Sequence, residues 1–142
     1  TPKPSSAASD VYKRQALATR FDLPLIIHSV HATEDVTDLL KSYSKSRGVI
    51  HAFSGSLQQA ENLLKINFSF GFGAALTNPH AYKLHDIVNF LPLESLVLET
   101  DDRDNPDELV QVAERVARIK KITVDEVIEQ CDQNTYNLFK IS

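Results

Sequence analysis

The chain has 142 residues, of which 42% are hydrophobic, 24% charged and 8% aromatic, a composition typical of one globular domain. Its 15 Lys and Arg residues against 19 Asp and Glu residues give a net charge of −4, which argues against a general attraction to DNA or to an anionic membrane but does not exclude a local cationic patch. The single cysteine excludes an internal disulfide, and no apolar run approaches the roughly 20 residues that span a bilayer, so we expect a cytoplasmic protein with no membrane partner.

The beginning of the chain differs in texture from the rest. Residues 1–14 (TPKPSSAASDVYKR) are rich in Pro, Ser and Ala and show neither helical nor strand periodicity. We predict that they form a disordered, non-native tail. Residues 15–142 are predicted to form the folded part, in which Gln15–Arg20 could close a helix.

Four short apolar runs then alternate with polar segments of helical pattern. The runs are Leu23–Ser29, Gly48–Phe53, Phe68–Ala74 and Leu96–Asp101, and the helical segments are Thr33–Ser44, Ser56–Lys65, Asn78–Asn89 and Pro106–Lys120. Short, nearly continuous apolar runs are typical of strands buried on both faces of a parallel sheet. The alternation predicts an α/β fold of about four right-handed βαβ units, with a last helix that begins after Thr123.

Polar residues interrupt three of these strands. Side-chain alternation defines three strand faces, namely Pro24, Ile26 and His28; Val49, His51 and Phe53; and Val97, Glu99 and Asp101. His28, His51 and Asp101 are therefore predicted at or near the carboxyl ends of three parallel strands, where α/β proteins assemble their sites. Glu99 is predicted one pleat further in.

Two imidazoles and one carboxylate on neighbouring strand ends suit Zn²⁺, Mn²⁺ or a similar cation. The chemistry that such a set indicates is metal-assisted hydrolysis. A single histidine in an apolar strand is more often a hydrogen-bonded core residue than a ligand. The hypothesis of a metal site therefore depends on the recurrence of polar residues in successive units.

Other features favour structural roles. Gly71 and Gly73 lack the third glycine of a dinucleotide-binding loop, and a close backbone approach at a strand end explains them better. Cys131 is predicted to be a packing residue of the last helix. Surface or capping roles are expected for His31, His80 and His85, and a solvated helix face is expected for the basic run Arg115, Arg118, Lys120 and Lys121.

Three segments together resemble the TatD family of metal-dependent hydrolases, in the family's order and spacing. They are PLIIHS around His28, GVIHAFSGSLQQAENLL around His51, and LVLETD ending at Asp101, and the resemblance extends from about Gln15 to Phe139. It implies a (β/α)₈ TIM barrel of the amidohydrolase type, of which this chain would form the C-terminal half. It also implies hydrolysis of phosphodiester bonds by a magnesium-dependent deoxyribonuclease whose intact site holds two divalent cations.

The resemblance also implies roles for individual residues. His28 and His51 would bind one cation, and Asp101 would belong to the site of the other and accept a proton from the attacking water. Glu99 would orient its neighbours. Arg103 and Asn105, in the short segment that follows the E-T-D motif, are weaker candidates for contact with substrate.

The chain departs from the family pattern in two respects that keep alternatives open. It contains no H-x-H sequence, and the bridging glutamate of the family has no counterpart. One hypothesis is therefore a truncated TatD-type deoxyribonuclease acting on DNA or another phosphoester, with its activity as a single chain left open. The alternative is a non-catalytic α/β fragment that self-associates or binds a partner, since a half barrel would expose strand edges suited to a homo-oligomer. The choice among Mg²⁺, Mn²⁺ and Zn²⁺ also stays open.

Overall fold

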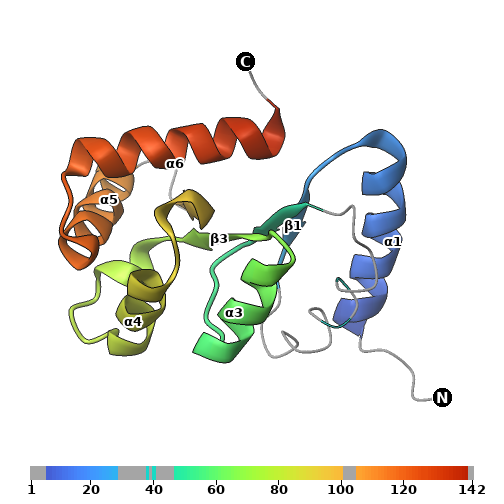
Figure 1. Ribbon diagram of the computed structural model, residues 1–142, viewed down its shortest axis with the longest axis horizontal. Helices are drawn as coiled ribbons and strands as arrows, with labels where there is room; N and C mark the ends of the chain where they lie inside the picture. The colour runs from blue at the N-terminus through green and yellow to red at the C-terminus, as the bar shows by residue number, and fades with distance from the viewer. Residues whose placement is uncertain (1–5, 29–37, 39, 41–46, 101–104, 141–142) are drawn as a thin grey trace.

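The computed structural model describes residues 6–28, 38, 40, 47–100 and 105–140, with side chains from residue 13 onward (Figure 1). Each of the four apolar runs contains one strand, and each strand is shorter than the run that predicted it. In chain order the elements are α1 (Ser6–Phe21), β1 (Leu25–Ile27), β2 (Gly48–Ile50), α3 (Leu57–Lys65), β3 (Ser69–Phe72), the 3₁₀ helix η1 (Ala74–Thr77), α4 (Tyr82–Phe90), the 3₁₀ helix η2 (Leu93–Ser95), β4 (Leu96–Leu98), α5 (Asp107–Lys120) and α6 (Val124–Phe139). Most of the predicted helix Thr33–Ser44 lies outside the described residues.

The four strands form one parallel sheet in the order β1-β2-β3-β4. In its register, Ile26 lies opposite Val49, and Gly71 lies opposite Val97. The α/β fold with a parallel sheet, predicted from the alternation of apolar runs and helical segments, is thus confirmed. Because all four strands run in the same direction, their carboxyl ends lie at one edge of the sheet.

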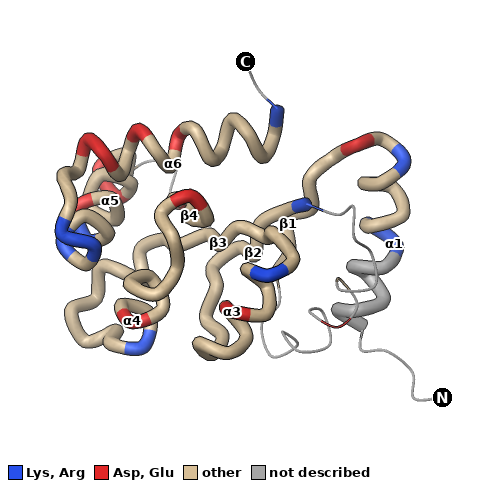
Figure 2. The backbone as a smooth tube through the Cα atoms, viewed as in Figure 1, with Lys and Arg blue, Asp and Glu red and all other residues tan. Residues whose placement is uncertain are grey.

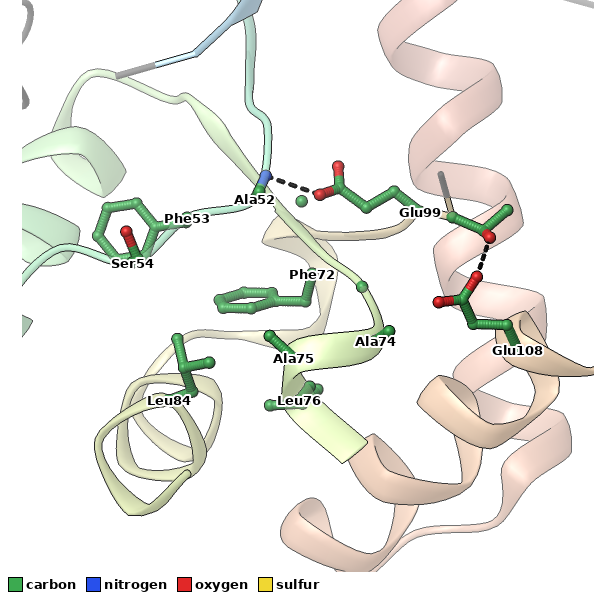
Figure 3. A pocket seen from close by; sticks show the side chains of 13 residues that line it. Ala52, Phe53, Ser54, Phe72, Ala74, Ala75, Leu76, Leu84, Glu99 and Glu108 are labelled. Carbon is green, nitrogen blue, oxygen red and sulfur yellow. Dashed lines mark hydrogen bonds between the residues drawn. The ribbon is translucent and has the colours of Figure 1, made fainter. Parts of the chain in front are cut away.

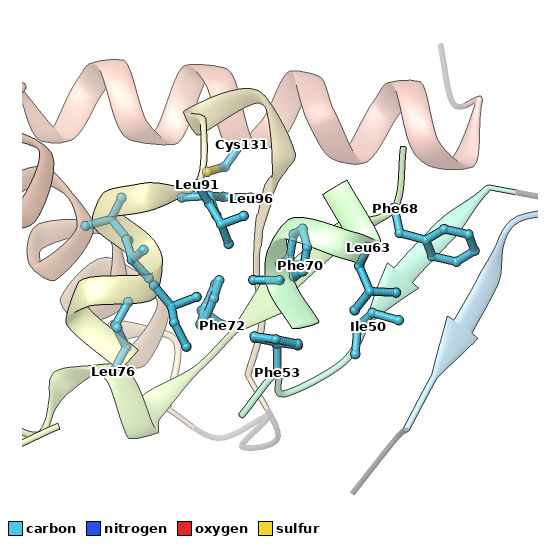
Figure 4. Packing of buried hydrophobic residues seen from close by; sticks show 14 of the residues in the cluster. Ile50, Phe53, Leu63, Phe68, Phe70, Phe72, Leu76, Leu91, Leu96 and Cys131 are labelled. Carbon is cyan, nitrogen blue, oxygen red and sulfur yellow. The ribbon is translucent and has the colours of Figure 1, made fainter. Parts of the chain in front are cut away.

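One face of the sheet packs against α3, α4 and α5 and forms the main core (Figure 4). Phe70 and Leu96 project from the strands into this core and are fully buried, as is Leu63 of α3. The rings of Phe53 and Phe70 meet edge to face with their centroids 5.1 Å apart, a favourable arrangement for two aromatic rings. Cys131 of α6 is buried in the same cluster, in agreement with its predicted packing role.

The opposite face of the sheet is covered more sparsely. Val49 and Val97 alternate with main-core neighbours in their strands and pack with Leu138 and Phe139, near the carboxyl end of α6. Figure 1 shows α6 running across the sheet towards the side of β1. On β1, however, the side chain of Ile26 is 47% exposed. This face is therefore the one on which polar groups near the strand ends can meet solvent.

The helix α1 differs from the disordered tail expected over residues 1–14. It begins at Ser6 and continues without a break to Phe21, so residues 6–14 are helical. Gln15 and Ala18, one turn apart, are both buried, and Ala18 belongs to the main core. The alanines of this segment favour a helix, and packing of one helix face stabilises it where periodicity alone gave no signal. Residues 1–5 lie outside the described residues.

Asp22, just after α1, links three segments that lie far apart in the sequence. Its carboxylate Oδ1 accepts a hydrogen bond from Nη1 of Arg47 at 2.7 Å, and its main-chain oxygen accepts one from Nη2 at 2.9 Å. Lys140, after α6, forms an ion pair with the same carboxylate. Arg47 also donates to the main-chain oxygen of Leu138 at 3.3 Å. These contacts fasten α1 and the end of α6 beside the start of β2.

Local sequence explains where two helices begin. The Ser56 side chain accepts a hydrogen bond from the Gln59 amide, and the Gln59 side chain accepts one from the Ser56 amide, which completes a capping box before α3. Thr123 accepts from the Glu126 amide at the start of α6, at the position expected from the sequence. Within the described ranges, no helix is both long and apolar enough to cross a membrane.

Candidate metal centre

His28 and His51 lie side by side at the carboxyl edge of the sheet. Each follows the last residue of its strand, and those last residues, Ile27 of β1 and Ile50 of β2, are paired. The His51 amide donates to the main-chain oxygen of Ile27 at 2.8 Å and so extends the pairing by one step. As a result, the imidazole centroids are 4.4 Å apart, with the ring planes inclined by 57°. His28 is exposed and His51 is partly buried.

The carboxylate of Glu99, just after β4, holds both His51 and the residue that follows it. Its Oε2 lies 2.7 Å from Nδ1 of His51, and its Oε1 accepts a hydrogen bond from the Ala52 amide at 2.6 Å. The main-chain amide of Glu99 donates to Phe72 of β3 at 3.0 Å, which fixes the position of its backbone. The carboxylate therefore bridges from β4 across β3 to the end of β2.

The chain turns sharply at Ala52, and the strand face predicted for Phe53 is therefore wrong. Alternation predicted that Phe53 shares a strand face with Val49 and His51, but Phe53 is buried in the main core on the other side of the sheet. Ala52 has a φ of 50°, in the left-handed region, which ends the strand and reverses the direction of the next side chain. The Phe53 ring then lies against Phe70 and Phe72.

A cavity of about 200 Å³ opens beside this cluster (Figure 3). Its floor is apolar and includes Phe72, Leu76 and Leu84, whereas Glu99 and Glu108 bring carboxylates to its wall. The hydroxyl of Thr100 donates to Oε2 of Glu108, so this second carboxylate is tied to the strand end. The volume is below the usual range for small-molecule pockets, which indicates room for a small group or for part of a larger ligand.

The sequence-predicted site residues divide into two groups. The structure places His28 beside His51 and Glu99 in contact with His51, while Asp101 and Arg103 lie outside the described residues. Asn105 is exposed just before α5. Within the part of the chain that the structure describes, no three His, Cys, Asp or Glu side chains gather as a ready metal-binding group.

Two contributors to the site were not assigned a role in it from the sequence. The Ala52 amide binds Glu99, and the absence of a side chain at Gly71 gives that carboxylate its room. The glycine does carry a signal, because the sequence predicts a close backbone approach at Gly71, although the group that approaches it is the Glu99 side chain. No signal marked Ala52, since alanine seldom adopts a left-handed conformation.

The two imidazoles and the carboxylate are of the ligand types that a borderline divalent cation takes. Histidines that bind metals usually donate their other ring N–H to a carboxylate, which fixes the tautomer and the ring orientation. Glu99 stands in that relation to Nδ1 of His51, so the lone pair of the neutral ring is on Nε2. The adjacent His28 ring brings a second imidazole to the same place, and imidazole nitrogen is a ligand type that Zn²⁺ and Mn²⁺ accept.

The basic run on α5 is less solvated than the sequence predicted. Figure 2 shows Lys and Arg gathered where α5 passes into α6. The Lys120 ammonium donates to the main-chain oxygen of Leu91, and partial burial lowers the pKa of Lys120 below its usual value. The Arg115 guanidinium donates to the Thr77 main-chain oxygen at 3.2 Å. At least these two side chains therefore brace neighbouring segments.

Comparison with known proteins gives concordant matches. The family model described as TatD related DNase matches residues 1–140. The chain is 36% identical over 137 residues to the uncharacterized metal-dependent hydrolase YjjV of Escherichia coli K12, covering 88% of this chain and 53% of that protein. It is 31% identical over 150 residues to the human 3′-5′ RNA nuclease TATDN2, covering 92% of this chain and 20% of that protein.

The structure also resembles a solved one. The crystal structure of YJJV, a TATD homolog from Escherichia coli K12, superposes with a TM-score of 0.81 at 34% identity, covering 89% of this chain and 54% of that chain. This likeness agrees with the TIM-barrel type of fold that the sequence motifs implied. The chain spans about half the length of YjjV, both as a sequence and as a solved structure. With a family model that matches almost the whole sequence, the chain belongs to the TatD related DNase family.

Proposed function

We propose that this chain provides metal-binding groups of a metal-dependent hydrolase that cleaves phosphodiester bonds, with DNA as its substrate. The observation that carries the proposal is the pair of imidazoles at the carboxyl edge of the sheet, one of them oriented by Glu99. Family membership supports the same chemistry, because relatives are named as metal-dependent hydrolases. The human relative is named as an RNA nuclease, which makes RNA the alternative substrate to test.

The proposed roles follow from the chemistry of each group. His28 and His51 would hold one divalent cation through ring nitrogens, with Glu99 keeping His51 in its tautomer. A divalent cation, when bound, supplies positive charge and Lewis acidity for hydrolysis of the ester. Asp101 is proposed to belong to the site of a second cation and to accept a proton from the attacking water.

Substrate contacts and the number of cations belong to the same proposal. Arg103 and Asn105 are proposed to contact the phosphate of the substrate, since a guanidinium and an amide both donate hydrogen bonds to phosphate oxygens. An intact family site is expected to hold two cations. Because the sequence contains no H-x-H, we propose that this chain by itself holds one.

A direct test measures cleavage of end-labelled single-stranded DNA and RNA of the same base sequence, with Mn²⁺ or Mg²⁺ and with a chelator. Wild-type protein, His51→Ala and His80→Ala would be compared, since His80 is exposed on the segment before α4 and its ring contacts Tyr82. Metal-dependent cleavage of DNA that is lost in His51→Ala alone is the expected result. Cleavage of RNA alone would reassign the substrate, and cleavage unaffected by His51→Ala would contradict the proposed site.

A second candidate is self-association through the strand edges. In the described part of the chain, β1 and β4 each pair on one side only, and unpaired strand edges favour association. We propose a second copy of this chain as the partner, because two parallel four-stranded sheets could join edge to edge. Light scattering that gives only the monomer mass over a range of concentrations would contradict it. The cytoplasmic location expected from the sequence stays a prediction.

A further inference from the structure

The carboxylate of Glu99 lies in space that only a glycine at position 71 leaves open. A Cβ atom placed on Gly71 would stand 2.2 Å from Oε2 and 2.9 Å from Cδ of Glu99, far inside van der Waals contact. Gly71 is in the interior of β3, paired with Val97. None of the four glycines of the chain has a positive φ, so backbone conformation does not require a glycine here. The glycine is required because the Glu99 carboxylate occupies the place of a Cβ atom.

The atom nearest to that missing Cβ is the one that holds the histidine. Oε2 of Glu99 is 2.7 Å from Nδ1 of His51, while Oε1 accepts a hydrogen bond from the Ala52 amide. Both oxygens are thus engaged by consecutive residues of one turn. A side chain on Gly71 would displace Oε2 first and could leave the contact of Oε1 with Ala52 partly intact.

We propose that Gly71 is a positioning residue for His51, acting through Glu99. The missing side chain lets the carboxylate lie against β3, within hydrogen-bond distance of Nδ1, and this contact sets the Nδ1–H tautomer of the neutral ring. The role of His51 as a metal ligand rests on the proposed function. The steric relation between Gly71 and Glu99 does not depend on it.

Gly73, the residue that follows β3, offers a matched control. A Cβ on Gly73 would be 3.1 Å from the main-chain oxygen of Glu99 and no nearer than 3.5 Å to its side chain, where it would meet Cγ. Gly73→Ala therefore adds the same methyl group one pleat further along without entering the space of the carboxylate. Gly71→Ala adds it at the carboxylate itself.

The first readout is the tautomer of His51 in metal-free protein at about pH 8.5, where an ordinary imidazole is neutral. Nitrogen-15 chemical shifts of the ring distinguish a protonated ring nitrogen from one that carries a lone pair. We expect protonated Nδ1 in the wild type and in Gly73→Ala, and a shift towards protonated Nε2 in Gly71→Ala and Glu99→Ala. A folded Gly71→Ala protein that keeps protonated Nδ1 would overturn the proposal.

A double-mutant cycle covers the case in which Gly71→Ala lowers stability too far for spectroscopy. If the added methyl group clashes with the Glu99 carboxylate, removing that carboxylate in Gly71→Ala/Glu99→Ala should restore much of the lost thermal stability. Losses that simply add would mean that Gly71 serves strand packing alone and would contradict the proposal. The cycle needs neither metal nor substrate.

Titration with Mn²⁺ or Zn²⁺ then separates this proposal from the proposed function. If His51 is a ligand, Gly71→Ala should weaken metal binding about 10- to 100-fold, the range typical of lost support for a metal-binding histidine, with little change in Gly73→Ala. If the wild type binds no metal, and the His51 tautomer still changes in Gly71→Ala, the proposed function is contradicted and the positioning role of Gly71 is supported. If Gly71→Ala changes the His51 tautomer and leaves the affinity for Mn²⁺ and Zn²⁺ unchanged, the tautomer of His51 has no part in metal binding.

Discussion

The imidazole rings of His28 and His51 are 4.4 Å apart, centroid to centroid, although each follows a different strand of the sheet. The contact follows from the parallel register, since both histidines come one residue after the paired Ile27 and Ile50. Neither ring alone makes a strong metal site, because a single imidazole leaves most of the coordination shell of a cation to water. Binding should therefore depend on both.

The first prediction concerns that dependence. In calorimetric titrations with Mn²⁺ and Zn²⁺, His28→Ala and His51→Ala should each abolish stoichiometric binding, because one ring cannot replace the pair. His85→Ala and His80→Ala serve as controls, since Nε2 of His85 binds the main-chain oxygen of Leu76 and the exposed His80 ring contacts Tyr82. Equal loss in all four variants would indicate unspecific chelation by surface histidines and contradict the site.

The sequence predicts those features of the sheet edge that depend on the order and direction of the strands. Short apolar runs alternating with helical segments predicted a parallel sheet, and a parallel sheet brings residues at successive strand ends to one edge. His28 and His51 are predicted at that edge on these grounds, and they lie there. Glu99, predicted one pleat further in, comes directly after β4, and Asp101, also predicted at the edge, lies outside the described residues. The pattern of apolar residues is sufficient to predict the strands, because burial of a strand on both faces of the sheet requires that pattern.

The turn at Ala52 and the start of α1 could not be foreseen in the same way. A left-handed alanine is held there by a carboxylate from a strand distant in sequence, so no local pattern announces it, and the extrapolated alternation misplaced Phe53. Helix α1 has weak local periodicity and gains stability from burial of Gln15 and Ala18 against the rest of the fold. Both errors arose where tertiary contacts overrode local pattern.

A second prediction concerns acid stability. Hydrogen bonds from Lys140 and then Arg47 lower the pKa of Asp22 below its usual 3.8. Because the folded-state pKa is depressed, the ionised carboxylate stabilises the folded protein above the unfolded-state pKa of about 4, and this contribution is lost as the pH falls through the folded-state pKa. Asp22→Asn should lower the melting temperature at neutral pH, with a difference from wild type that narrows below about pH 4.

The control for this prediction is Asp86→Asn, a change on the exposed surface of α4. Asp22 is itself exposed, so the effect should be small and should shrink further at high salt, where surface ion pairs are screened. A melting temperature that differs between Asp22→Asn and wild type by the same amount at pH 7 and at pH 3 would show that the charge of Asp22 has no part in it.

A third prediction concerns Cys131. Burial raises the pKa of this thiol to about 12, so it remains protonated in the folded protein at pH 8. Since only the thiolate reacts readily with disulfide reagents, labelling of native protein should be very slow and should become rapid in denaturant. The raised pKa also predicts a pH dependence of the free energy of unfolding. The contribution of the protonated Cys131 thiol is complete below the unfolded-state pKa of about 8.5 and declines as the pH rises towards 12.

Cys131→Ala separates the two parts of that prediction. Without the thiol, the component of alkaline destabilisation that belongs to Cys131 should disappear, while the lost packing lowers stability at every pH. Fast labelling of the native wild type, at the rate of the unfolded chain, would mean that the α6 helix opens readily.

The last prediction compares two asparagines of α6. Each accepts a hydrogen bond from a glutamine four residues earlier, but one is buried and the other is exposed. Asn134 is buried, donates to the main-chain oxygens of Leu93 and Leu96 at 2.9 and 2.8 Å, and accepts from Gln130 four residues earlier. Asn137 accepts from Gln133 in the same way at 2.9 Å but is exposed. Replacing Asn134 with Ala removes its hydrogen bonds to the main-chain oxygens of Leu93 in η2 and of Leu96 at the start of β4, at a cost of about 1–3 kcal/mol in the free energy of unfolding.

Asn137→Ala should change that free energy by no more than about 0.5 kcal/mol, because water replaces the lost contact and alanine favours the helix. Chemical denaturation of both variants measures the difference directly. Since Asn134 ties the last helix to the strand that carries Glu99, Asn134→Ala should also loosen the Glu99–His51 contact, seen as a partial change in the ring nitrogen shifts of His51. Equal destabilisation by the two substitutions would show that the helix-to-strand bonds contribute nothing beyond the pair within the helix.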